Sequence, residues 1–247
     1  MNILVCIDDT DNIESRGTGE LASLLAQALE KNGWGKTEPV TRHQLFVHPD
    51  IAYTSHNSAM CFAADIVPGH LASFTGFAKE FLARESAEGS DPGLCIVTID
   101  ALAGRDDLIA FGRRAKQQVL TKQEAYGLAQ RLGIHLSEHG GTGLGIIGAL
   151  AGSGLRMTGS DGRFRGKFYV DTATGIVDVA ELKRQTGVAV VKSIGGPVLH
   201  EAEKVQLGDK VKAVLLEGRS TLLVTPNTMD AARAPWQTCT KQQLKVY

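Results

Sequence analysis

The chain has 247 residues, of which 43% are hydrophobic and 21% charged, and its formal net charge is −1. These values are ordinary for a globular protein with a sizeable core, and they exclude a disordered or fibrous chain. No stretch approaches the roughly 18 apolar residues of a membrane span, and the first residues lack a secretory signal. We therefore predict a cytoplasmic protein without membrane contact. The near-neutral charge gives no whole-chain sign of nucleic-acid binding.

The first part of the chain alternates apolar runs with amphipathic segments. An apolar run at residues 2–7 predicts a buried strand that ends at Asp8, and residues 18–32 predict a helix that ends at Gly33. Further strands are predicted at residues 43–48, 58–65, 94–99 and 134–136, and further helices at 70–84, from the capping box at Thr121 to Leu132, and at 144–152. The pattern at residues 108–114 fits either type of element.

The pattern changes after Gly154 to short strand-like pieces separated by turn dipeptides. These strands are predicted at residues 167–170, 188–194, 198–205, 210–216 and 221–225, and the polar tail after Pro226 is expected to be loosely attached. We therefore predict an α+β protein, with a core at residues 1–155 and a smaller β-rich region at residues 156–247.

Three carboxylates fall within four residues where the first predicted strand ends, at Asp8, Asp9 and Asp11. Like charges this close repel one another, and a hard divalent cation such as Mg²⁺ relieves the repulsion while sharing oxygen ligands with phosphates. Thr18 follows at a predicted helix start, where backbone N–H groups and the helix dipole favour an anion. The candidates are Asp8, Asp9 and Asp11 as metal ligands and catalytic residues, Thr18 as a catalytic residue, and Thr10, Gly17 and Gly19 as nucleotide contacts. In the alternative interpretation, the acids end a strand and cap turns while Thr18 caps a helix.

A glycine-rich segment precedes the predicted helix at residues 144–152. Exposed backbone N–H groups ahead of a helix start are typical of a phosphate-binding loop. The phosphate-binding candidates are His139, Gly140, Gly141, Thr142, Gly143 and Gly145. The glycines at 143, 145 and 148 also match the GxGxxG dinucleotide motif, which leaves a nicotinamide dinucleotide enzyme as an alternative. A glycine-rich helix entry that serves only close packing is the structural alternative.

Three further features have weaker support from the pattern. The polar residues of segment 48–58 join two predicted strands and can reach a ligand, although polar loops between strands are common. The basic run 163–167 suits phosphate or RNA binding, or a solvated hairpin tip. His135 and His139 have the spacing of two metal ligands on a helix, but the glycines at 133 and 140 argue against a helix there.

Two motifs resemble the archaeal isoleucine-tRNA 2-agmatinylcytidine synthetase family. The similar residues are Ile7-Asp8-Asp9-Thr10-Asp11 with Gly17-Thr18, and the run from Gly141 to Ala151, with a looser likeness at His48-Pro49-Asp50-Ile51, Ser55 and Ser58. Along residues 1 to about 155, these motifs follow one another in the same order as in the family. The resemblance implies a kinase-like domain, beside a ferredoxin-like part with a mixed sheet, that uses ATP and Mg²⁺, cleaves ATP to AMP and passes a phosphate through a threonine. It maps the metal ligands onto Asp8, Asp9 and Asp11, and the threonine onto Thr18.

The chain also departs from that family. Arg16-Gly17 stands where the family has a segment of Met-Cys-Thr-Thr character, and Ala52, Tyr53 and Thr54 replace a proline, a tryptophan and a lysine. The family also carries C-terminal tRNA-binding modules, including a cysteine zinc ribbon. We expect no such ribbon here, because this chain has four cysteines and no CxxC pair, and no tRNA-binding module is recognisable in its sequence. The resemblance therefore implies a shared nucleotide-binding core and not the same tRNA reaction.

Two functions from different classes follow from these observations. The favoured interpretation is an ATP- and Mg²⁺-dependent enzyme of phosphoryl or nucleotidyl transfer, with an acceptor that the sequence does not name. The alternative is a non-catalytic module that binds a nucleotide or phospho-ligand, acting with a separate RNA-binding partner. RNA and a second copy of the chain are additional candidate partners.

Overall fold

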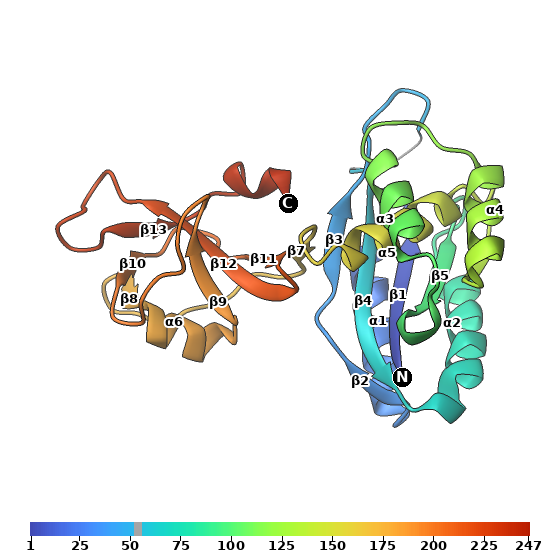
Figure 1. Cartoon of the computed structure of the whole chain (residues 1–247), viewed down its shortest axis with the longest axis horizontal. Coiled ribbons are helices and arrows are strands. Elements are labelled where there is room, and N and C mark those ends of the chain that lie inside the picture. The colour runs from blue at the N-terminus through green and yellow to red at the C-terminus, as the bar shows by residue number, and fades with distance from the viewer. Residues whose placement is uncertain (52–55) are drawn as a thin grey trace. The chain divides into compact units, whose positions relative to one another are not determined.

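An antiparallel sheet forms the centre of the first of two units, Met1–Thr158 and Gly159–Tyr247, in a computed structural model that describes residues 1–51 and 56–247 (Figure 1). In that sheet the strand order is β6-β5-β1-β4-β3, and β2 also pairs with β4. Its strands are β1 (Asn2–Asp8), β2 (Gly35–Thr37), β3 (Thr41–Gln44), β4 (Ser58–Ile66), β5 (Gly93–Thr98) and β6 (His135–Glu138). The central strand β1 is buried because its neighbours β4 and β5 pair with it on both sides.

Helices cover both faces of this sheet. The first-unit helices are α1 (Thr18–Lys31), α2 (Leu71–Glu85), α3 (Arg105–Arg114), α4 (Lys122–Leu132) and α5 (Gly145–Met157), with short 3₁₀ turns at Pro68–His70 and Ile99–Ala101. Alternate residues of β1 point to opposite sides: Ile3 and Val5 pack with α1 and α2, whereas Leu4 and Cys6 pack with α3, α4 and α5. The two apolar cores explain why β1 reads as a continuous apolar run rather than an alternating one.

Helix α5 lies unusually close to the sheet because small residues line its buried side. A Cβ atom added to Gly152 would lie 2.5 Å from Sγ of Cys6, and one added to Gly154 would lie 2.1 Å from the carbonyl oxygen of Leu108 in α3. Side chains at these positions would push the helix away from its neighbours. The glycines therefore allow the second half of α5 to pack directly against the sheet and α3.

The second unit is rich in short strands, around an apolar core of its own. Its elements are β7 (Arg163–Phe164), β8 (Ile176–Asp178), α6 (Val179–Thr186), β9 (Val190–Ser193), β10 (Lys204–Gln206), β11 (Ala213–Leu216), β12 (Arg219–Pro226), β13 (Trp236–Thr238) and a 3₁₀ turn at Gln243–Val246. The order is β7-β11-β12-β13-β10-β8, with β9 parallel to β12 and β10 parallel to β13. Together the two units confirm the predicted α+β class, although the parallel pairs lie in the second unit.

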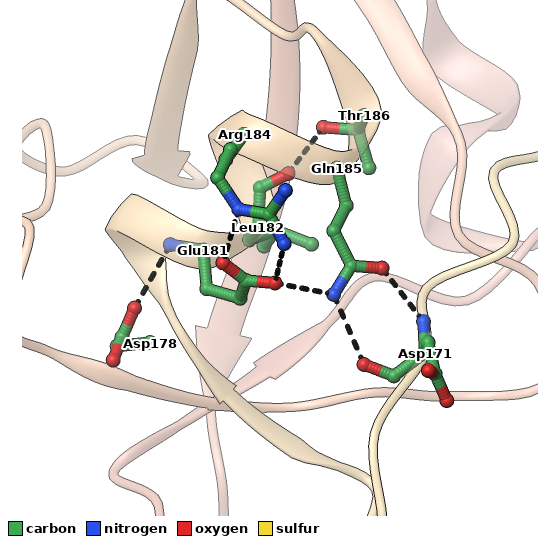
Figure 2. Close-up of polar contacts among 7 residues, drawn as sticks. All are labelled: Asp171, Asp178, Glu181, Leu182, Arg184, Gln185 and Thr186. Atoms are coloured by element: carbon green, nitrogen blue, oxygen red, sulfur yellow. Dashed lines mark hydrogen bonds and ion pairs between the residues drawn. The ribbon is translucent and has the colours of Figure 1, made fainter.

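Helix α6 of the second unit was not expected from the sequence. Asp178 caps it by accepting a hydrogen bond from the N–H of Glu181 at 2.9 Å, and Gly187 ends it at φ 69°. Figure 2 shows that Glu181 pairs with Arg184 and accepts from Gln185, whose side chain also bonds the backbone of Asp171 at 2.7 and 3.0 Å. The helix has eight residues and only two buried positions, Val179 and Leu182, so it offers few apolar positions from which to predict it.

Several other helices and strands differ from the elements predicted from the sequence. Residues 105–114 form α3, which settles the ambiguous segment, and α5 runs to Met157. Residues 167–170 form only an isolated bridge, between Phe168 and Val211. The tail after Pro226 is not loose, because β13 pairs with both β12 and β10 and Leu244 is buried. Among the helices of residues 1–51 and 56–247, none has the length and apolar character needed to cross a membrane.

Candidate functional site

A cavity of about 300 Å³ lies in the first unit where β1 ends. Its lining comes from five places: the end of β1, the start of α1, the strands β3 and β4 with the segment between them, residues 115–120, and the start of α5. Asp91, just before β5, completes the wall. Strand pairing explains this assembly, because Asp8 lies opposite Gly93 in the register of β1 and β5.

The three predicted carboxylates Asp8, Asp9 and Asp11 all line this cavity. Burial, reinforced by the charges of Asp9 and Asp11, raises the pKa of Asp8 to about 8. Burial together with the charges of Asp91 and Asp11 raises the pKa of Asp9 to about 6. Asp9 also has φ 53°, a left-handed conformation that costs energy for a residue with a Cβ. The fold therefore holds these acids together against electrostatic and backbone strain.

Thr18, the first residue of α1, is tied to the acidic turn by its hydroxyl group. Its Oγ1 donates to Oδ1 of Asp11 at 3.3 Å. It also accepts from the hydroxyl of Thr10 at 3.1 Å and from the backbone N–H of Thr10 at 3.4 Å. Thr10 is fully buried and is not among the described residues that line the cavity, so its contact with the cavity goes through Thr18.

The starts of two helices, α1 and α5, lie on the cavity wall. Gly17, Thr18 and Gly19 come from the first, and Gly145 and Gly148 from the second. Within the described residues, neither helix has a side-chain cap at its N-terminus. Each helix start carries a partial positive charge that favours an anion. At α5 the first N–H groups, those of Gly145, Ile146 and Ile147, already donate to backbone oxygens, so this helix acts through its dipole.

The glycine-rich loop has a different place from the one expected. Gly145 lines the cavity, but His139, Gly140, Gly141, Thr142 and Gly143 are not among its lining residues in the described part of the chain. Thr142 instead bonds Asp91 through both its backbone N–H and its hydroxyl, each at 2.5 Å. His139 shares the hydroxyl of Ser137 with His135, at 2.8 and 3.1 Å. Burial and the charge of Lys79 lower the pKa of both histidines.

The lining residues that the sequence did not nominate as site residues include Asp91, Gly148 and Arg42. A Cβ atom on Gly148 would lie 1.7 Å from Oδ2 of Asp8, so this glycine makes room for the carboxylate against α5. Arg42 brings a positive charge from β3 and donates through Nε to Oγ of Ser58 at 2.9 Å. Gly148 belongs to the GxGxxG match, and Asp91 stands in an Asp-Pro-Gly turn before a strand, whereas no local motif marks Arg42.

The polar segment 48–58 contributes to the wall on both sides of its undescribed part. Asp50, Ile51, His56, Asn57 and Ser58 are lining residues. The side chain of Asn57 donates to the carbonyl oxygen of Phe46 at 2.6 Å, which fixes the entry into β4. Residues 52–55, which include Ser55 and the three positions that differ from the synthetase family, lie outside the described residues.

The donor set of the cavity suits a hard divalent cation, which prefers carboxylate oxygens. In residues 1–51 and 56–247, no group of three or more His, Cys, Asp or Glu side chains is arranged to hold a metal ion. A cation would therefore be held by one or two of the acids and by oxygens of a bound ligand, the arrangement typical of Mg²⁺ with phosphates. The raised pKa values of Asp8 and Asp9 fit such a site, because an unpaired cluster of ionised acids is costly.

The basic run of the second unit has structural contacts of its own. Arg163 and Phe164 form β7, and burial lowers the pKa of Arg163. The ammonium group of Lys167 lies 4.6 Å from the ring centre of Tyr169, which is 80% exposed. Phosphate or RNA binding by this segment stays a prediction.

Comparison with known proteins places these features in context. No family model matches the chain. The chain is 30% identical over 159 residues to TiaS of Methanosarcina acetivorans, an isoleucine-tRNA 2-agmatinylcytidine synthetase, in a match that covers 63% of this chain and 36% of that protein. The chain spans about a third to a half of the length of the curated relatives it matches.

Solved structures show the same relationship. Apo TiaS, an isoleucine-tRNA agmatidine synthetase, matches with a TM-score of 0.54 and 25% identity, over 62% of this chain and 35% of that one. A complex of TiaS with its isoleucine tRNA and ATP matches in fold with a TM-score of 0.55 and 21% identity, over 80% of this chain and 48% of that one. The chain is thus TiaS-like in sequence and in fold, and shares with that family part of its domains.

Proposed function

We propose that the first unit is an ATP-binding core that carries out Mg²⁺-dependent phosphoryl or nucleotidyl transfer. The observation that carries this proposal is a cavity whose wall combines strand-end carboxylates with the starts of α1 and α5, neither of which has a side-chain cap. Helix starts bind phosphate oxygens, and carboxylates hold the cation that accompanies them. The likeness to TiaS, which was solved with ATP, supports the choice of nucleotide.

The side chains of the cavity have distinct roles in this proposal. Asp8, Asp9 and Asp11 are the candidate ligands of Mg²⁺, which when bound would neutralise charge on the phosphates. The hydroxyl of Thr18 donates to Asp11, so Asp11 can take its proton if that oxygen attacks a phosphorus atom of ATP, the phosphoanhydride bond breaks and the remainder of the nucleotide leaves. Arg42 and the two helix starts stabilise negative charge. Transfer of this kind depends mainly on positioning and charge stabilisation.

The acceptor is a separate part of the proposal. Two curated relatives are isoleucine-tRNA 2-agmatinylcytidine synthetases, so an RNA is the first candidate to supply the accepting group. This chain covers 36% of each of those proteins, and activity on RNA therefore needs its own assay. The competing function is a binding module that holds a nucleotide without turning it over.

Calorimetric titration with nucleoside triphosphates and Mg²⁺ tests binding, and chromatography of the nucleotides after incubation tests turnover. We expect ATP binding that needs Mg²⁺, turnover that Asp8→Asn and Asp11→Asn abolish, and no effect of Glu80→Gln, a control on the exposed side of α2. Intact-mass spectrometry after incubation with ATP reports a phosphate on the protein, which Thr18→Ala should remove. Binding without turnover would support the binding module instead. If the protein binds none of the nucleotides, both the enzyme and the binding module are refuted.

A further inference from the structure

The glycine-rich loop before α5 holds an acidic side chain rather than lying against the cavity. The carboxylate of Asp91 accepts from the backbone N–H of Thr142 at Oδ1 and from its hydroxyl at Oδ2, each at 2.5 Å. Lys122 donates to the carbonyl oxygen of Thr142 at 2.7 Å and pairs with Glu138 at 2.7 Å. The loop is therefore anchored on one side to α4 and β6, and on the other to Asp91.

The glycines of the loop are required by this close approach. Gly141 has φ 56°, and a Cβ atom there would lie 1.8 Å from Oδ1 of Asp91. A Cβ atom on Gly145 would lie 2.1 Å from the carbonyl oxygen of Asp91, which accepts the N–H of Gly145 at 3.1 Å. The loop thus contacts Asp91 at both its side chain and its backbone.

Asp91 faces the same cavity as the three acids of β1. It stands two residues before Gly93, which pairs with Asp8 in the sheet, so strand register brings it beside the acidic turn. A carboxylate offers about four lone-pair positions, and the two bonds from Thr142 leave oxygen lone pairs free for a cation.

We propose that Asp91 is a fourth acidic residue facing the bound cation and nucleotide, and that Thr142 is its positioning residue. This proposal rests on the proposed function, since it concerns the same cavity. It assigns the glycine-rich loop an indirect role: the loop aims a carboxylate, and the helix starts contact phosphate.

Binding of Mn²⁺ in the presence of a non-hydrolysable ATP analogue tests this without relying on turnover. Free Mn²⁺ is followed by electron paramagnetic resonance, and far-UV circular dichroism checks folding. We expect Asp91→Asn to weaken Mn²⁺ binding by about tenfold or more, and Thr142→Val by about tenfold, as for other residues that orient a metal ligand. Thr142→Ser keeps the hydroxyl and should bind within about twofold of wild type. Asp106→Asn, an exposed position on α3, is the control.

Each outcome has a definite meaning. Wild-type affinity in folded Thr142→Val, or equal losses in Thr142→Ser and Thr142→Val, would overturn the positioning role. Wild-type affinity in Asp91→Asn would overturn the role of Asp91, while strong Mn²⁺ binding by the wild-type protein leaves the proposed function standing. If the wild-type protein binds no Mn²⁺ with the analogue, the proposed function fails first, and this inference fails with it.

Discussion

Replacing Asp8 by asparagine should stabilise the ligand-free protein at neutral pH. The folded state raises the pKa of this buried carboxyl group from 3.8 to about 8. Between these values the unfolded chain releases the proton while the folded state keeps it, so the free energy of unfolding falls as pH rises. Each pH unit in this window corresponds to about 1.4 kcal/mol. The neutral amide of Asp8→Asn has no such titration.

The structure sets the size of the effect. From pH 5.5 to 7.5, the stability of Asp8→Asn relative to wild type should rise by about 2–3 kcal/mol, and over the whole window from pH 4 to 7.5 by about 4 kcal/mol. Asp9, whose pKa is raised to about 6, acts in the same direction at the lower end of the window. It is present in both proteins, and the comparison between them isolates Asp8.

Urea denaturation with EDTA and without nucleotide measures this difference. The chain has two tryptophans, Trp34 in the first unit and Trp236 in the second, so a Trp236→Phe background makes fluorescence report the unit that contains Asp8. Glu80→Gln in the same background is the exposed control. A pH-independent difference between Asp8→Asn and wild type, or a less stable Asp8→Asn at pH 7.5, would refute the reasoning.

Four further substitutions test other contacts. Gly148→Ala should lower ATP turnover in steady-state kinetics, because its methyl carbon would lie 1.7 Å from Oδ2 of Asp8 and must displace that carboxylate; turnover equal to wild type would contradict this. Gly154→Ala should cost about 1–3 kcal/mol in urea denaturation, because its Cβ would lie 2.1 Å from a backbone oxygen of α3; an unchanged midpoint would show that α5 adjusts freely. Arg156→Leu should also cost about 1–3 kcal/mol by the same measurement, and Glu38→Gln less than about 1 kcal/mol, because Arg156 is buried while the side chain of Glu38 is 64% exposed; equal losses would mean that the ion pair itself dominates.

Predictions from the sequence succeeded where a local pattern carries the physical signal. The apolar run of β1 and the capping box of α4, in which Thr121 and Glu124 cap each other, depend on neighbouring residues alone. Predictions failed where tertiary contacts decide. The strand expected at 167–170 is a single bridge, between Phe168 and Val211. The tail after Pro226 is held by strand pairing that its polar composition does not reveal.

The sequence by itself determined that three acids end a buried strand just before a helix with Thr18 at its start, since this depends on consecutive residues. It also determined that a glycine-rich segment enters α5. Only the tertiary structure decided what these features face. Antiparallel pairing of β1 with β5 brings Asp91 beside the acids, and the bond from Thr142 turns the glycine loop toward Asp91 rather than into the cavity. Such contacts join residues far apart in the chain, and local spacing carries no information about them.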